Sequence, residues 1–513
     1  MRADLVENKP NGWARLADIL IILGAIGLGS YVAQNDFESV VPLILSLSGF
    51  IIVRFALKRP FHEAFTLYIA IAAFNYYYFY CSKLTGRNPT DVPGSIGLPA
   101  TDLEKLQKDI VFGLLLLLAG IKLFIGRIQG KEMWLKRTDH ALLQMVILLA
   151  GYSILRSFFI VLEGDTPFNA IYYLRINIEY ALIPFLLLTS LISNEKQLRV
   201  MYGGLLYTLP LVALLGIIEF FIHGSPYERS FSGGQLLSRA TSTLQNPNNL
   251  GGYLGTTMGI YILYFIKQKL SNMERLLFWP TIPLAMICLL MTMSRSSLLS
   301  FFVALAICLV ILLVSSKKRL GKDKYKYYKK MMTYFVIIGS LCMFVTWRYF
   351  GLSSAVIDAF EMYLSEDAAL RNVRVFALLP TIKAMLSNPL GAFFGYSKES
   401  FHFAVDNGYA TVLIRSGVIG FALYMSVWIM AFKTCIKRIT DKEREHNFLY
   451  LICFYTLLYQ AIYAFSTPIH QNFPHNMYYW FTIGVIIWLE SAFIRPGAQA
   501  QAEEEALQDA KNT

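Results

Sequence analysis

The sequence predicts an all-α protein that crosses a membrane many times. The chain of 513 residues is 56% hydrophobic and only 16% charged. Its apolar residues fall in repeated runs of about twenty, which is the length an α-helix needs to cross a bilayer. These runs lack the alternation of polar and apolar residues that a membrane β-barrel requires. Helices are therefore the expected spanning elements.

We expect about 12–14 transmembrane helices, because the first six runs have the least defined boundaries and one or two runs are candidates for re-entrant segments. The runs cover residues 17–35, 38–57, 62–80, 109–126, 140–162, 169–193, 200–222, 248–266, 277–293, 296–315, 331–350, 408–432, 447–465 and 476–494. The chain divides into N-terminal transmembrane helices (1–199), transmembrane helices with two polar outer turns (200–350), a long helical periplasmic loop (351–407), C-terminal transmembrane helices (408–494) and a cytoplasmic tail (495–513).

The basic loops predict the orientation. Lys and Arg are concentrated in segments 267–275, 317–330 and 433–444. Cytoplasmic loops carry such an excess, so these three segments and both termini are expected in the cytoplasm. The unusual polar residues then lie in the outer segments, 223–247, 293–297, 351–407 and 466–475. In a bacterium this is the periplasmic face of the inner membrane.

The net charge of +12 is explained by these basic loops. No basic groove with interleaved aromatic residues suggests nucleic acid as a partner. The six cysteines lack metal-ligand or pairing spacing, so neither a metal nor a cofactor is expected.

The first outer segment contains Arg239 and ends in Asn246-Pro247-Asn248. Amide side chains and a guanidinium at a membrane surface suit a hydroxyl-rich or anionic ligand. The alternative is a plain helix start, with Asn as the cap and proline in the first turn.

The second outer segment is a sharp reversal that holds Arg295. Ionisable residues at membrane depth often mark a ligand site, and guanidinium suits phosphate. Alternatively, Arg295 extends to the interface and has no ligand.

The long outer loop predicts amphipathic helices over 355–386. Arg371 and Arg374 are three residues apart and share a helical face. They either face a ligand or pair with Glu366 or Asp367 on the surface.

His402, Asp406 and Asn407 precede the next span. Asp406 is a candidate general base or the N-cap of the helix that begins at Gly408. His402 is the alternative base.

Further polar residues lie within the spans and in the last outer segment. Arg415 is expected to face a cavity below Asp406, and Arg175 is expected to pair with Glu179 at a spacing of four.

In the last outer segment, His470 and His475 either line a sugar-binding mouth or have no role. Too few other ligands accompany these histidines for a zinc site.

Taken together, residues 200–490 resemble the O-antigen ligase and polymerase superfamily of bacterial envelope glycosyltransferases. The matching motifs are Asn246-Pro247-Asn248, Ser294-Arg295 with Leu299, Arg374 fifteen residues before Pro389, and Asp406-Asn407 nine residues before Gly417-Val418-Ile419-Gly420. Ligases of the family have His-Asn where this chain has Asp406-Asn407.

The resemblance implies a GT-C-like fold and an inverting, metal-independent transfer from an undecaprenyl-diphosphate-linked oligosaccharide to an acceptor. Arg295 and Arg374 would stabilise charge on the leaving diphosphate, with Arg239 as a weaker third, and Asp406 would take the acceptor proton. Membrane lipid and a chain-length regulator are the other implied partners.

Asp406 in place of histidine favours a polymerase, which joins repeat units, over a ligase, which moves the glycan to lipid A–core. A protein O-oligosaccharyltransferase is a further alternative. The non-enzyme alternative is a lipid-linked sugar transporter or flippase, although no internal repeat is visible and transporter sites tend to lie near the bilayer midplane.

Overall fold

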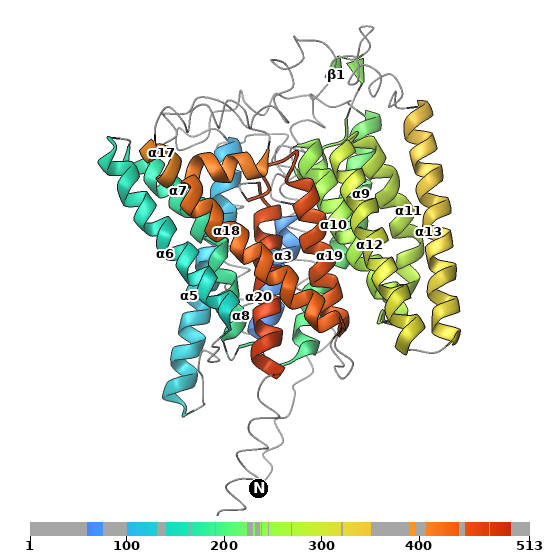
Figure 1. Ribbon diagram of the computed structural model, residues 1–513, viewed down its shortest axis with the longest axis horizontal. Coiled ribbons are helices and arrows are strands. Elements are labelled where there is room, and N and C mark those ends of the chain that lie inside the picture. Colours follow the sequence, from blue (N-terminus) through green and yellow to red (C-terminus); the bar gives the residue numbers. More distant parts are fainter. Residues whose placement is uncertain are drawn as a thin grey trace, which may run out of the picture.

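The computed structural model describes residues 59–74, 100–130, 140–164, 166–189, 191–222, 229–230, 236–237, 239–244, 246–267, 269–319, 322–349, 389–396, 407–440, 447–470 and 472–493. Nearly all of these residues are helical, and the long helices stand side by side with roughly parallel axes (Figure 1). The predicted spans 17–35 and 38–57 lie outside the described residues, as does the tail 495–513.

Six helices in the described ranges are long and apolar enough to cross a membrane. They cover Lys108–Ile128, Ala141–Leu162, Glu195–Ile222, Asn272–Met291, Arg295–Val314 and Gly408–Ile439. Large apolar side chains on several of them face outward, among them Leu162 (79% exposed) and Phe221 (73%). An apolar perimeter of this kind suits lipid and not water. The structure therefore supports the predicted multi-pass helical membrane protein.

The helices occur in the expected order along the chain. The first half contains α3 (Phe61–Ala72), α5 (Ala100–Ile128), α6 (Ala141–Leu162), α7 (Pro167–Ile178), the 3₁₀ turn η1 (Tyr180–Leu182), α8 (Ile183–Leu188) and α9 (Glu195–Ile222). The second half contains α10 (Pro247–Ile266), α11 (Asn272–Met291), α12 (Arg295–Arg319), α13 (Lys322–Tyr349), α17 (Pro389–Phe394), α18 (Gly408–Thr440), α19 (Asn447–Tyr463) and α20 (His475–Phe493). A small antiparallel pair, β1 (Arg229–Ser230) and β2 (Leu236–Leu237), lies in the connection before α10.

The span predicted over 169–193 is confirmed only in part, because the helical segment ends at Leu188 and a 3₁₀ turn interrupts it. The segment is broken into α7, η1 and the short α8, and Thr189 at the end of α8 is extended. Pro184 occupies the first turn of α8, where its missing N–H is tolerated, but it could not continue a helix from α7 without loss of a hydrogen bond. The apolar composition of this stretch concealed the interruption.

Helix α10 packs unusually closely against α19. Side chains on α19 donate hydrogen bonds to backbone carbonyls of α10. The bonds run from Tyr455 to Gly255 (2.6 Å), from Tyr459 to Gly251 (3.2 Å) and from Tyr463 to Asn248 (2.6 Å). A Cβ atom on Gly255 would lie 2.6 Å from the Tyr459 ring, so only glycine fits there. Small residues that allow such close approach are typical of helix interfaces in membranes.

Helix α18 is bent near its start. Gly417 adopts φ 64° inside it, and α17 packs against the bend. The amide of Tyr396, just after α17, donates to the carbonyl of Ile414 (2.7 Å). A Cβ on Gly417 would overlap the carbonyl of Phe393, so glycine is required for both the conformation and the space.

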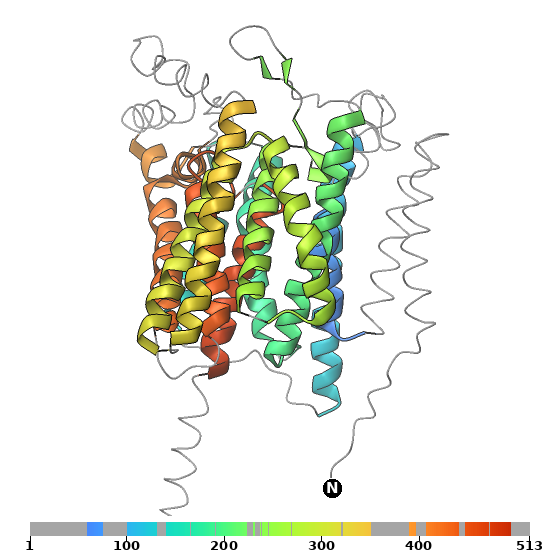
Figure 2. The same ribbon diagram turned by 90° about the vertical axis from the view of Figure 1, so that its right-hand side faces the viewer.

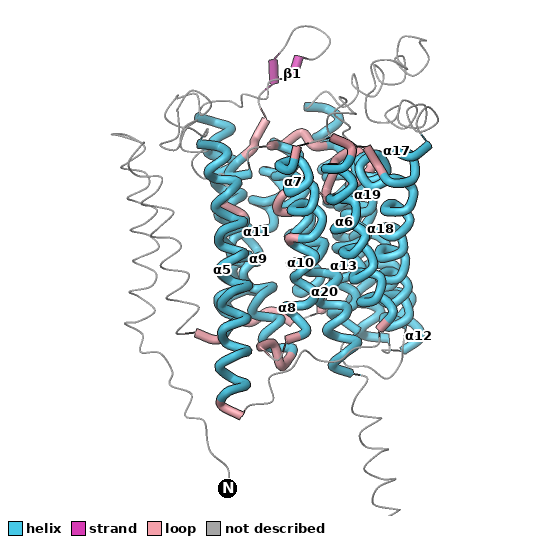
Figure 3. Tube along the Cα trace, turned by 90° about the vertical axis from the view of Figure 1, so that its left-hand side faces the viewer, coloured by secondary structure: helices cyan, strands magenta, loops and turns pink. Residues whose placement is uncertain are grey.

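The connections α9–α10, α11–α12 and α19–α20 all lie at the same end of the bundle, which is the upper end in Figures 1, 2 and 3. The short segment 389–396 and the start of α18 lie there too. We call this end the polar end, because the predicted outer segments meet there. The other part of the loop 351–407 lies outside the described residues.

Candidate functional site

Arg239 joins two outer connections. It lies just before α10 and its side chain is buried. Its Nε donates to the carbonyl of Thr292 at the end of α11 (2.8 Å), and its Nη2 donates to the side-chain oxygen of Asn248 (3.2 Å). The amide of Ala240 adds a bond to the carbonyl of Met291 (3.0 Å). The guanidinium therefore fixes the segment before α10 against the α11–α12 turn.

A buried carboxylate also holds the segment that precedes α10. Glu219, near the end of α9, is completely buried. It accepts hydrogen bonds from the Thr241 amide (2.9 Å), the Thr241 hydroxyl (2.6 Å) and the Ser242 amide. Sequence reasoning missed this residue. The available signal was a lone glutamate in an apolar span, which usually has a specific partner.

The Asn-Pro-Asn motif starts α10 and also contacts its neighbours. The side chain of Asn246 accepts from the Asn248 amide (2.8 Å), and Pro247 occupies the first turn, so the predicted helix start is confirmed. The side chain of Asn248 receives Arg239, and its carbonyl receives the Tyr463 hydroxyl from α19 (2.6 Å). Asn248 thus connects α10 to the segment that carries Arg239 and to α19.

The α11–α12 turn carries Arg295, which differs from Arg239 in the exposure of its side chain. The Ser294 and Ser297 hydroxyls are hydrogen-bonded at 2.8 Å and pack against Gly251 of α10. Met293 has φ 51°, which produces the sharp reversal. Arg295 is the first residue of α12 and its side chain is exposed at the polar end.

Asn407 anchors the start of α18. Its side-chain oxygen accepts from the Ala410 amide (3.0 Å), and its amide group donates to the carbonyl of Phe465 (3.1 Å). The Gly408 amide donates to the carbonyl of Ala464 (2.7 Å). Asn407 therefore supplies a side-chain cap at this helix start. Asp406 itself lies outside the described residues, together with Arg371, Arg374 and His402.

Arg415 lies on α18 before the bend, and its side chain is half-buried. It is close enough to His470, in the α19–α20 connection, to act on it electrostatically. Burial, together with the smaller effect of the Arg415 charge, lowers the pKa of His470 to about 3. His470 is therefore a neutral imidazole at physiological pH.

His475 is completely buried at the first position of α20. It packs against Gly252 of α10 and the Tyr463 ring, whose centroid is 5.6 Å from its own. Within the described part of the chain, neither ring nitrogen has a well-aligned hydrogen-bond partner, although the Asn249 backbone is nearby. His475 belongs to the tightly packed interior and does not line an open mouth.

A charged cluster lies beside these connections. Arg175 pairs with Glu179 as predicted (3.6 Å), and more closely with Asp109 of α5 (2.6 Å). Lys108 approaches Asp109 (3.3 Å) and lies 4.6 Å from the centroid of the Phe473 ring in the α19–α20 connection. Sequence reasoning missed Lys108 and Asp109, because only the fold shows that α5 and α7 meet.

The described residues contain no group of three His, Cys, Asp or Glu side chains arranged to hold a metal ion. No known family model matches this chain, and no curated protein matches it either. The geometry of the polar end and the sequence motifs are therefore the basis for a functional proposal.

Proposed function

We propose that this chain is a bacterial envelope polysaccharide polymerase. It would join undecaprenyl-diphosphate-linked oligosaccharide repeat units at the outer face of the inner membrane. One observation carries the proposal: segments far apart in the sequence meet at one end of the bundle through the contacts of Arg239 with Thr292 and Asn248, and of Asn248 with Tyr463. Two of the motifs that resemble the ligase and polymerase superfamily, Asn246-Pro247-Asn248 and Ser294-Arg295, lie in the connections that these contacts join.

Cations at this end suit a diphosphate. In the transfer, the bond between the sugar C1 and the diphosphate oxygen breaks, and negative charge grows on the leaving group. A positioned arginine can stabilise such charge by ~2–4 kcal/mol. Arg295 is exposed at the polar end, and we assign it to the donor together with Arg374. Arg239 already donates to two protein oxygens, so we assign it to positioning the start of α10.

Asp406 is the proposed base. The acceptor hydroxyl attacks C1 from the face opposite the diphosphate, its proton passes to the Asp406 carboxylate, and the configuration inverts. A positioned base contributes ~10²–10⁴-fold to such a step. Asn407, the next residue, is fixed by two side-chain hydrogen bonds at the start of α18. His402 is the alternative base.

One observation favours the non-enzyme alternative. The interruption between α7 and α8 lies beside the charges of Arg175, Glu179 and Asp109. Broken helices with charged groups are typical of transporter sites. The resulting candidate is a lipid-linked sugar flippase.

The test is deletion of the gene and complementation with wild type, Asp406→Ala or Arg374→Ala, followed by electrophoresis of the surface polysaccharide. Arg127→Ala, near the end of α5 opposite the polar end, is the matched control. We expect both site variants to lose the long-chain ladder while one repeat unit still caps the acceptor, with the control unchanged.

Other outcomes identify the alternatives. Loss of all capping with accumulated free polymer identifies a ligase. Loss of capping with no polymer, and with lipid-linked units retained on the cytoplasmic side, identifies a flippase. An unchanged ladder in both variants overturns the site assignment.

A further inference from the structure

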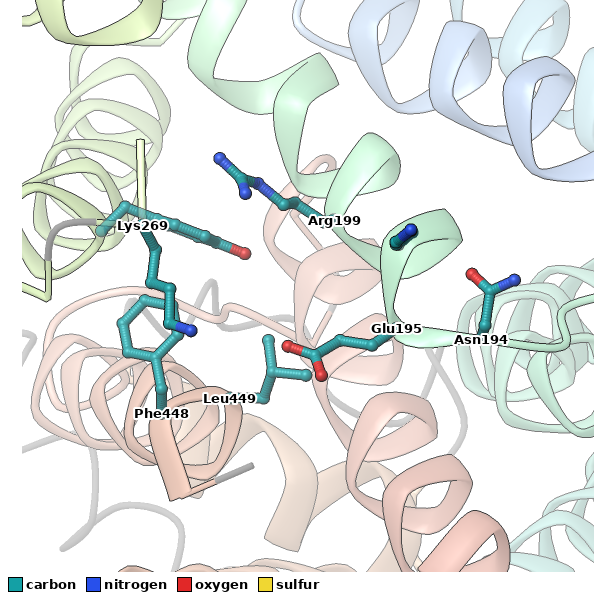
Figure 4. Close-up of a pocket in the computed structure, with 8 residues that line it drawn as sticks. Asn194, Glu195, Arg199, Lys269, Phe448 and Leu449 are labelled. Atoms are coloured by element: carbon teal, nitrogen blue, oxygen red, sulfur yellow. The ribbon is translucent and has the colours of Figure 1, made fainter. Parts of the chain in front are cut away.

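A pocket of about 520 Å³ lies at the end of the bundle opposite the polar end. It is formed where α9 begins, α10 ends and α19 begins (Figure 4). The basic loops predict that this end faces the cytoplasm. None of the residues that line it belongs to the proposed glycosyltransferase site.

Three cations line the pocket. Lys196 and Arg199 come from the first turns of α9, and Lys269 comes from the α10–α11 connection. Arg199 pairs with Glu274 (3.2 Å), whereas neither lysine makes an ion pair within the described residues. Glu195 is the one carboxylate in the lining, so the pocket carries an excess of positive charge. Such a site attracts an anion.

A buried hydroxyl also lines the pocket. Tyr264 is only 2% exposed, and its hydroxyl has no hydrogen-bond partner in the described part of the chain. Arg199 and Glu195 are both close enough to act on it electrostatically. A buried hydroxyl without a partner is unfavourable, so an acceptor from outside the protein would stabilise it.

The remaining wall is apolar. Phe448 and Leu449, at the start of α19, line the pocket, and the Phe448 ring packs edge-on against Tyr264 with centroids 4.8 Å apart. Figure 4 shows the side chains of Lys269 and Phe448 next to each other on one side, with Arg199 above and Glu195 opposite. The pocket thus combines cations with an apolar wall at one end of the helical bundle.

We propose that this pocket binds the headgroup of an anionic phospholipid from the cytoplasmic leaflet. Lys196 and Lys269 contact the phosphate, the Tyr264 hydroxyl donates to a phosphate or ester oxygen, and Phe448 and Leu449 pack against the glycerol and the first acyl carbons. Basic pockets between helices on this side of a membrane are suited to such headgroups. The proposal is independent of the reaction at the polar end.

The test measures phosphatidylglycerol binding to the purified full chain in neutral-lipid nanodiscs. The first variant is Lys196→Gln with Lys269→Gln. Its matched control is Lys433→Gln with Lys437→Gln, which removes the same charge from the last turns of α18, outside the pocket. The second variant is Tyr264→Phe, which removes only the hydroxyl. Inorganic phosphate and phosphatidylcholine are the comparison ligands.

We expect the pocket double variant to bind phosphatidylglycerol ~30-fold more weakly, since each of the two lysines near an anionic lipid surface contributes about 1 kcal/mol. Tyr264→Phe is expected to weaken binding severalfold while the ligand-free protein is as stable as the wild type or more so, and the control pair is expected to have little effect. Equal losses in the pocket and control pairs, or no effect of Tyr264→Phe, would overturn the proposal. Stabilisation by inorganic phosphate equal to that by phosphatidylglycerol would overturn the lipid assignment.

Discussion

Arg239 and Asn248 are joined by a hydrogen bond of 3.2 Å between the guanidinium and the side-chain oxygen. The same guanidinium holds the carbonyl of Thr292 at the end of α11. A single buried cation therefore fixes the start of α10, and with it the Asn-Pro-Asn motif, relative to the α11–α12 turn that carries Arg295. The predictions below follow from this and related contacts.

Arg239→Lys is expected to lower thermal stability, whereas Arg295→Lys is not. Lysine keeps the charge but cannot reach Thr292 and Asn248 at the same time, because it lacks the guanidinium fork. Each lost bond of a charged donor costs ~1.5–3 kcal/mol. Arg295 is exposed, so the same substitution there is a matched control. Heating the purified proteins in detergent and measuring the folded fraction checks this. Equal melting temperatures would contradict it.

Glu219→Gln is expected to destabilise the protein by ~1–3 kcal/mol. The carboxylate accepts from the amides of Thr241 and Ser242 and from the Thr241 hydroxyl, and a glutamine places an NH₂ donor against one of these donors. The control is Glu63→Gln, whose carboxylate forms only a partly exposed pair with Arg59 at 3.9 Å. Urea or thermal unfolding in detergent measures the difference. A loss no larger than that of the control would refute the positioning role.

Gly417→Ala is expected to disrupt the bend in α18. At φ 64° an alanine is strained, and its Cβ would overlap the Phe393 carbonyl. Gly113→Ala is the control, because nothing lies within 4 Å of a Cβ at that helical position. The control should be neutral or stabilised by up to about 1 kcal/mol, since alanine favours helix. Comparable folded yields for the two variants would contradict the assignment of the bend to Gly417.

His470→Asn is expected to reduce the loss of stability in acid. Burial and Arg415 lower the folded-state pKa of His470 to about 3, whereas an unfolded histidine titrates near ~6.5. Between these values the unfolded chain binds a proton that the folded chain does not, so folded stability falls as the pH falls. Melting temperatures of the wild type and the variant at about pH 7.5 and about pH 5 test this. An identical acid-induced decrease would argue against it.

Much of the fold was predictable because local sequence determines it. The apolar runs predict the spanning helices, and Asn246-Pro247-Asn248 predicts the start of α10, since capping depends on neighbouring residues. The pairing of Arg175 with Glu179 follows from helical spacing. The interruption at Pro184 was the exception, because hydropathy alone does not distinguish a continuous span from two short helices.

The site was less predictable, because its contacts join segments far apart in the chain. No pattern in the neighbouring sequence indicates that Glu219 accepts a hydrogen bond from the Thr241 amide. Nor does any indicate that Arg175 forms an ion pair with Asp109 of α5. The sequence likewise does not show that Arg239 is buried whereas Arg295 is exposed. The roles of Arg371, Arg374, His402 and Asp406 stay predictions from the sequence.

The tyrosines of α19 have a consequence for assembly of the bundle. Lipid tails are as apolar as leucine, so apolar contact alone gives two membrane helices little reason to prefer one alignment over another. Here Tyr455 and Tyr459 each require a glycine opposite. Sliding α10 by one residue would replace these glycines with bulkier side chains, so mismatched pairings are excluded sterically. The contact between α10 and α19 therefore selects a single register of the two helices during insertion and folding. That register in turn fixes the relative positions of the three connections at the polar end.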